Sequence, residues 1–169
     1  MEIRVRHSAG GIGPAQTELR AYVRALAKGL RPASMPDLLC VAIAANCHGH
    51  ARRRRELERH IDPTIVPHTV FLCPDPHVER WYLADPSAFA RVVGGGTGYV
   101  PHKCERSTYK RLFREAVRAA GQEPSLDGTE YGTELVECMD LYQAGKAVPS
   151  LGAAVEDLKR AFQVLRRRS

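Results

Sequence analysis

An unbroken apolar run, LLCVAIAA at residues 38–45, constrains the fold of this chain more than any other segment. A run of this length suits a β-strand, and a strand that is apolar on both sides must be covered on both faces of its sheet. HTVFLC at residues 68–73 has the same character, and the arginine-rich segment between the two runs has the length of one helix. This order predicts two parallel strands joined by a right-handed crossover.

The residues before that run extend the same pattern. EIRVRH at residues 2–7 alternates apolar and polar side chains and predicts a short strand. Pro14 suits the first turn of a helix that ends near Gly29. We therefore expect an α/β fold in which a mostly parallel sheet is flanked by helices.

The chain beyond residue 75 is expected to be mostly helical. Asp75 and Asp85 each precede a proline, which is typical of a helix N-cap, and the helical spacing of Trp81 favours a core position. Further helices are predicted over residues 106–120, 130–142 and 150–167, with a loop at residues 94–103. The 169 residues suit one domain, with an α/β core over residues 1–90 and a helical extension over residues 91–169.

Positive charge is in excess and is clustered along the chain. Lys and Arg number 25 against 19 Asp and Glu, which gives a net charge of +6. The basic residues gather in ARRRRELERH at 51–60, YKRLFREAVR at 109–118 and KRAFQVLRRRS at 159–169. Such clusters are typical of proteins that bind nucleic-acid backbones, although a salt-bridged helix face or an acidic protein partner would give the same pattern.

Neither a membrane span nor a secretion signal is expected from the sequence. No apolar stretch approaches the ~20 residues that cross a bilayer, and MEIRVRHSAGG lacks the apolar part of a signal peptide. The five cysteines, at positions 40, 47, 73, 104 and 138, contain no C-x-x-C pair. Dispersed thiols of this kind favour a reducing cytosol over a disulfide framework, so we expect a cytoplasmic protein without a membrane partner.

Polar side chains follow each expected strand, and the carboxyl ends of parallel strands meet at one edge of a sheet. The three ends are HSAGG at 7–11, AANCHG at 44–49 and CPDPHVE at 73–79. The last of these contributes Asp75 and Glu79. A helix cap for Asp75 and an exposed helix surface for Glu79 are the alternatives to a functional role.

The second strand end carries nitrogen and sulfur donors. Cys47, His48 and His50 could bind zinc, because thiolate and imidazole are the ligands that zinc prefers. Their spacing matches no standard zinc motif, and a fourth ligand would have to come from elsewhere, such as His7, His60 or His77. Zinc is therefore an alternative and not the leading expectation. No nucleophile elbow or phosphate-binding loop is present in the sequence.

Two segments of the chain, taken with the predicted order of strands and helices, resemble parts of the Toprim (topoisomerase–primase) nuclease-like domains: CVAIAANCHG and PDPHVERWYLADP. The likeness is to the small stand-alone versions that accompany ATPases in antiphage defence systems, and it covers roughly residues 3–90. It depends most on PDPHVERWYLADP, in which an acidic residue precedes a Trp-containing helix that ends in Leu-x-Asp.

The resemblance implies a metal site with one ligand missing. Toprim domains hold Mg²⁺ on a glutamate near the end of the first strand and on an Asp-x-Asp-like pair at the end of a later strand. That pair maps onto Ala44 and Asn46, so position 44 lacks the expected aspartate. The first-strand glutamate has no clear counterpart, and Glu18 is the nearest acid. Either the natural protein has lost the carboxylate or position 44 carries an inactivating substitution.

The implied function is that of a Mg²⁺- or Mn²⁺-dependent nuclease, or a subunit derived from one, which acts on DNA or tRNA with an ATPase partner and is inactive because of Ala44. The implied catalytic positions are Ala44, Asn46, Glu79 and Glu18, and the implied metal ligands are Asn46, Glu79 and Asp75. Phosphates would be contacted by Arg52, Arg53, Arg54, Arg55, Lys103 and Lys110. The alternatives are a non-catalytic Toprim-like module that docks on an ATPase, and a zinc-binding hydrolase that uses Cys47, His48 and His50.

Overall fold

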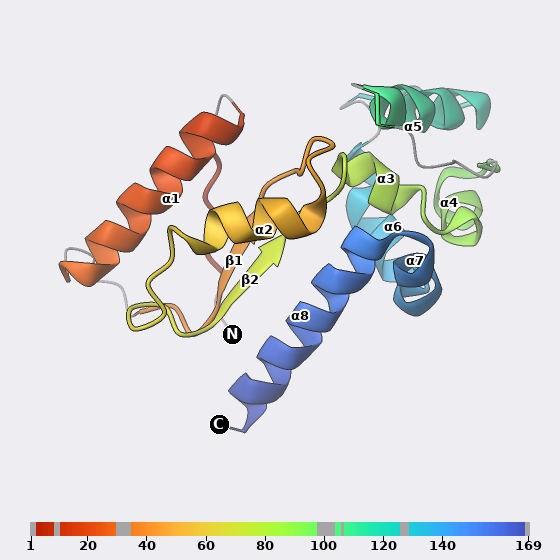
Figure 1. The fold of residues 1–169 in the computed structure, drawn as a ribbon. Helices are drawn as coiled ribbons and strands as arrows, with labels where there is room; N and C mark the ends of the chain where they lie inside the picture. Colours follow the sequence, from red (N-terminus) through yellow and green to blue (C-terminus); the bar gives the residue numbers. More distant parts are fainter. Residues whose placement is uncertain are drawn as a thin grey trace.

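The computed structural model describes residues 3–8, 11–29, 35–97, 104–105, 107–125 and 129–167. Within these residues, a two-stranded parallel sheet is flanked by helices (Figure 1). The strands are β1 (Leu39–Ala42) and β2 (Thr69–Leu72), and they pair in the register Leu39 with Thr69. Helix α2 (His50–Glu58) lies in the connection between them, so the predicted strand–helix–strand unit is confirmed.

The strand predicted at residues 2–7 is not formed by the described part of that segment. Residues 3–8 have no regular secondary structure, and the side chains of Ile3 and Val5 are 73% and 69% exposed. Alternating side chains form a strand only where a neighbouring strand supplies hydrogen bonds. Among the described residues the sheet consists of β1 and β2 alone, so it is smaller than the sequence predicts.

Helix α1 (Ile12–Ala27) confirms the predicted N-terminal helix and packs on the sheet. One core cluster joins side chains of both strands, α1, α2 and the chain after β2: Leu19, Val23, Val41, Leu57, Phe71 and Cys73. Leu19 and Val23 are four residues apart and therefore lie on one face of α1. Burial of each large aliphatic side chain contributes roughly 1.5–3 kcal/mol, so this cluster fixes the two helices against the strands.

A second core lies among the helices that follow β2. These elements are α3 (Val78–Tyr82), α4 (Pro86–Val93), α5 (Thr108–Ala119), the 3-10 turn η1 (Thr129–Tyr131) and α6 (Gly132–Cys138). Their cluster is centred on aromatic side chains, in which the rings of Phe89 and Phe113 meet edge to face. Figure 1 shows this group on the side toward which the β2 arrow points. The helical part therefore faces the carboxyl ends of the strands.

The single helix predicted over residues 130–142 is wrong, because the chain is interrupted at Asp140. The Asp140 side chain accepts hydrogen bonds from the backbone N–H groups of Tyr142 and Gln143, and thereby begins a separate helix, α7 (Leu141–Ala147). An aspartate with free backbone amides two and three residues ahead is a strong N-cap, which favours a new helix start over continuation.

Helix α8 (Pro149–Arg166) closes the structure and contacts both α7 and β2. A Cβ atom added at Gly145 would lie 2.9 Å from the Cα of Gly152, so α7 and α8 touch through their backbones. No helix within the described ranges has both the length and the apolar character needed to cross a membrane.

Candidate functional site

Two of the three predicted strand ends lie side by side. Beyond the strands, the Ala45 N–H donates to the Pro74 carbonyl at 2.7 Å and the Asn46 N–H donates to the Pro76 carbonyl at 3.1 Å. Asn46 and Cys47 then take left-handed φ values of 49° and 67°, which turn the chain out of its extended course. This pairing places the segment that contains Asn46 directly beside the segment that leads into α3.

Glu79 is the buried acid of this region. It lies in the first turn of α3 and is 4% exposed, so the surface position that is usual for a helical glutamate does not apply. Its Oε1 atom is 4.0 Å from Nζ of Lys110 on α5. Its Oε2 atom is buried without a hydrogen-bond partner among the described residues. Leaving such an atom unpaired costs roughly 1–3 kcal/mol, or more when the group is charged.

Asp75 precedes α3 and does not cap it. The N-cap residue of α3 is His77, and no side chain bonds to the free amides there, so the predicted capping role of Asp75 is wrong. Its Oδ1 atom is buried and also lacks a partner within the described residues. Asp85, in contrast, caps α4 as predicted, since Oδ1 accepts from the amides of Ser87 and Ala88 at 2.9 and 3.0 Å.

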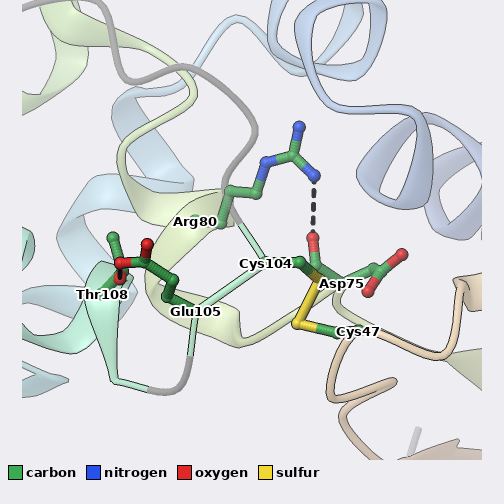
Figure 2. Close-up of a disulfide and its surroundings, with 6 residues drawn as sticks. All are labelled: Cys47, Asp75, Arg80, Cys104, Glu105 and Thr108. Carbon is green, nitrogen blue, oxygen red and sulfur yellow. Dashed lines mark hydrogen bonds between the residues drawn. A yellow bond between two sulfur atoms is a disulfide. The ribbon is translucent and has the colours of Figure 1, made fainter.

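Neighbouring side chains hold the Asp75 backbone in place. The Ser150 hydroxyl oxygen on α8 accepts from the Asp75 N–H at 3.3 Å and from Nε1 of Trp81 at 2.8 Å. Arg80 donates to the Asp75 carbonyl at 2.9 Å (Figure 2), and its guanidinium lies 5.7 Å from the centre of the Tyr109 ring. Trp81 is therefore a structural residue packed inward, as its spacing predicts. Ser150 and Arg80 carry no sequence signal that links them to Asp75.

Electrostatic effects join these groups into one neighbourhood. Burial lowers the pKa of His77, and the charge of Lys110 acts in the same direction, while Glu79 and Asp75 act against it. Burial and the charge of Glu79 together raise the pKa of Tyr82. His77 is consequently a neutral imidazole at pH 7, next to two carboxylates and one ammonium group.

A disulfide joins Cys47 to Cys104, with 5.6 Å between the Cα atoms (Figure 2). The prediction of free, dispersed thiols is therefore wrong for these two cysteines, whereas Cys40, Cys73 and Cys138 are free. The link ties the turn after Asn46 to the segment that precedes α5. An odd set of cysteines without a recurring spacing does not reveal its pairing, so this contact depends on the fold.

The disulfide also bears on the zinc alternative. A sulfur atom in a disulfide is not a thiolate, so Cys47 cannot be a zinc ligand while the link is intact. His48 is exposed and His50 opens α2. Within the part of the chain that the structure describes, no three His, Cys, Asp or Glu side chains are grouped so that they could hold a metal ion.

The remaining predicted site residues are placed less centrally. Ala44 is partly buried in the chain between β1 and Asn46, and Asn46 itself is exposed. Glu18 is exposed on α1. Lys103 lies outside the described residues. The structure thus brings together the Asn46 segment, Asp75, Glu79 and Lys110.

The arginines of α2 are largely engaged with acids. Arg52 and Arg53 contact Glu56 at 3.2 and 2.6 Å, and Arg54 contacts Glu58 at 2.7 Å and also Asp157 of α8. Arg53 is only 4% exposed, which leaves it little surface for a phosphate. Arg55 is exposed and bonds only weakly to the Ala51 carbonyl, at 3.4 Å. For Arg52, Arg53 and Arg54 these contacts favour the salt-bridged interpretation.

No protein-family model, curated protein or solved structure matches this chain. Its class is defined by its own fold and site: a mixed α/β protein with two parallel strands, whose carboxyl ends carry buried carboxylate oxygens that lack hydrogen-bond partners among the described residues. The resemblance to Toprim domains stays a prediction based on sequence motifs.

Proposed function

We propose that the strand ends form a site for a divalent cation and a phosphodiester, of the Toprim nuclease type, which lacks one carboxylate at position 44. The unpartnered Oε2 atom of the buried residue Glu79 is the observation that carries this proposal. A buried, unsatisfied carboxylate lowers stability, and such groups concentrate at functional sites. Oδ1 of Asp75 is also buried without a hydrogen-bond partner among the described residues, and it would supply a second oxygen ligand for the cation.

The donor set suits a hard cation in part. Mg²⁺ and Mn²⁺ prefer oxygen ligands, which the carboxylates of Asp75 and Glu79 and the amide of Asn46 would supply. The described residues offer no complete group of three acidic or imidazole ligands. The resemblance locates the missing acid at Ala44, two residues before Asn46. When bound, the cation would activate water and neutralise charge that develops on the phosphodiester.

The chain's own residues would position the substrate around that cation. Lys110 is half exposed and lies 4.0 Å from Glu79, so its ammonium group can reach a phosphate and also balances Glu79 when no cation is bound. His77, held neutral by its lowered pKa, can accept a proton or a hydrogen bond from water. Arg80 keeps the Asp75 loop in place through the Asp75 carbonyl.

The substrate class that fits this chemistry is nucleic acid, either DNA or tRNA. The expectation of an ATPase partner in antiphage defence comes from the motif resemblance alone. With alanine at position 44, we expect the protein to bind nucleic acid weakly and not to cleave it. A non-catalytic module that docks on an ATPase is the competing proposal, and it would give the unsatisfied oxygens no cation to bind.

The test restores the missing acid and compares it with a neutral residue of the same shape. We expect Ala44→Asp to bind Mn²⁺ at least about tenfold more tightly than Ala44→Asn in calorimetry, because the added charge supplies a ligand. Only Ala44→Asp should cleave plasmid DNA or tRNA when Mg²⁺ is added, and a further Glu79→Gln change should abolish cleavage.

Folded Ala44→Asp protein that neither binds Mn²⁺ nor cleaves either substrate would contradict the nuclease proposal and favour the non-catalytic module. Stoichiometric zinc in elemental analysis of the purified protein would instead favour the zinc alternative of Cys47, His48 and His50, with the Cys47–Cys104 link reduced.

A further inference from the structure

The C-terminal part of α8 presents a basic surface that also carries apolar side chains. Residues 158–169 contain five Lys or Arg residues and no acid. The side chains of Phe162 and Val164 are 40% and 38% exposed. Lys159, Phe162, Gln163 and Arg166 recur on one face of the helix, where they line a surface hollow of about 260 Å³. We call these four residues the basic surface.

The opposite face of this helix end is the one turned toward the rest of the molecule. Leu158, Ala161 and Leu165, which also share a face, are partly buried. Figure 1 shows the last turns of α8 extending away from α6 and α7 toward the C-terminus. The basic surface therefore points outward. Lys159 contacts Glu156 at 2.9 Å, an exposed pair of small energetic value that a partner can displace.

A second surface of opposite charge lies on α6 and the start of α7. Residues 129–142 contain four acids and no Lys or Arg. Glu134 and Glu137 are exposed on α6, next to Val136, which is 47% exposed. Tyr142 is 62% exposed, and Lys146 lies 4.2 Å from the centre of its ring at the edge of this area. We call Glu134, Val136, Glu137 and Tyr142 the acidic surface.

We propose that the acidic surface of one molecule docks on the basic surface of a second copy of this chain. Eight large apolar side chains are exposed among the described residues, and four of them lie in or beside these two surfaces: Val136, Leu141, Tyr142 and Phe162. Apolar side chains that gather within a charged rim mark interaction sites, whereas single ones do not. The charges of the two surfaces are complementary.

Contact between the two surfaces has to be intermolecular. Helix α7 packs on the first turns of α8 through Gly145 and Gly152. Phe162 is ten residues further along α8, which is roughly 15 Å along the helix axis. Because two different surfaces meet, the contact either is made twice in a two-fold dimer or repeats head to tail into a ring or a filament.

A second copy explains more of these features than nucleic acid does. Phosphates would neutralise Arg166 and Lys159 but would leave Phe162 uncovered, since backbone contacts are polar. Nucleic acid would also repel the acidic surface. A second copy covers both surfaces at once, and this inference does not depend on the proposed function.

The experiment is a charge exchange between the two surfaces, measured by sedimentation velocity on the full chain. We expect the unaltered protein to associate with rising concentration, and less so at high salt. Lys159→Glu with Arg166→Glu, or Glu134→Lys with Glu137→Lys, should each weaken association at least about tenfold, because like charges then meet. A mixture of the two variants should associate again, since opposite charges face each other across every contact.

Arg24→Glu on α1 with Lys28→Glu at its C-cap, which reverses two exposed charges elsewhere, is the matched control and should associate like the unaltered protein. Circular dichroism and thermal unfolding confirm that each variant is folded, and Phe162→Ser provides a variant that weakens association without a charge change.

Three results would overturn the proposal. The unaltered protein could remain monomeric at every concentration, the reversed variants could associate unchanged, or their mixture could fail to associate. If the unaltered protein is monomeric and the basic-surface variant alone loses nucleic-acid binding, the basic surface is a nucleic-acid site.

Discussion

The acid that pairs with α2 and the acids at the strand ends are built in opposite ways, although Nε of Arg53 on α2 is also buried without a partner among the described residues. In the arginine region, Asp157 is 9% exposed and accepts from Arg54 of α2 and from Arg160 of its own helix. At the strand ends, Glu79 is as deeply buried, yet one of its oxygens has no partner in the described part of the chain, and Lys110 is 4.0 Å from the other.

This difference separates an acid whose charge is paired within the fold from acids that have an unpartnered oxygen. A buried acid that is fully paired contributes to the packing of α2 against α8, and its removal takes a buried acceptor from both Arg54 and Arg160. A buried acid that is poorly paired lowers stability and is retained for another reason. The arginine run attracts attention in the sequence, but the strand-end acids are the better functional candidates.

The largest expected effect concerns the disulfide, which joins the turn after Asn46 to the segment before α5, beside the strand-end acids Asp75 and Glu79. Cys104→Ser opens a loop in which the cysteines are 57 residues apart, and a loop of this length corresponds to roughly 2–4 kcal/mol of stability. We expect that loss in urea denaturation, with faster hydrogen exchange at residues 44–49 and in α5. Cys138→Ser, which alters a free exposed thiol, is the control.

If hydrogen exchange in Cys104→Ser rises equally in α2 and α8, the disulfide supports the whole fold. The disulfide would then not distinguish the strand ends from the α2 region.

The next effect tests the paired acid. Asp157→Asn should lower the free energy of unfolding by about 1–3 kcal/mol, since Arg54 and Arg160 lose a buried charged acceptor. Glu156→Gln alters the neighbouring exposed acid and should change stability by less than about 0.5 kcal/mol. Equal effects of the two changes in chemical denaturation would mean that burial of Asp157 adds nothing.

A smaller effect of opposite sign is expected at the unpaired acid. Glu79→Gln should raise the free energy of unfolding by up to about 1 kcal/mol in metal-free buffer, because a buried charge is removed at a site with a poor partner. Glu115→Gln, which alters an exposed acid paired with Arg111, is the control. A clear loss of stability would show that Glu79 is a structural residue and that the contrast with Asp157 is mistaken.

The smallest effect is a pH dependence from His77. The pKa of His77 in the folded protein lies below its ordinary value of 6.5, so the unfolded chain takes up the proton first as the pH falls. The stability that comes from keeping His77 neutral is complete above pH 6.5 and is lost as the pH falls through the window below 6.5. His77→Gln should remove most of the pH dependence of the free energy of unfolding across that window, as measured by denaturation at a series of pH values. If the pH dependence is unchanged, it comes from other titratable groups.

Much of the fold could be predicted from local patterns. The apolar runs at 38–45 and 68–73 indicate β1 and β2 correctly, and Pro14 and Gly29 indicate the ends of α1. The expectation that the first strand is covered on both faces is wrong, because Cys40 and Ala42 are exposed. The prediction of a strand at residues 2–7 is wrong for its described residues. Alternation of apolar and polar side chains does not indicate whether a neighbouring strand is available for pairing. The division at Asp140 was missed because a single capping residue competes with a continuous helical pattern.

Of the candidate site, only the acidic residues could be predicted from the sequence. Asp75 and Glu79 stand out because they follow a strand, but nothing local indicates that Ser150 would hold Asp75 or that Lys110 would face Glu79. The pairing of Cys47 with Cys104 is of the same kind.

The sequence by itself determined β1, β2 and most of the helices, the excess of positive charge and the acids that follow β2, since these depend on neighbouring residues and on side-chain chemistry. Only the tertiary structure decided which charges are paired, which thiols are joined and which apolar side chains remain exposed. The physical reason is that pairing and burial depend on distances between residues far apart in the chain, and those distances are set by packing as a whole.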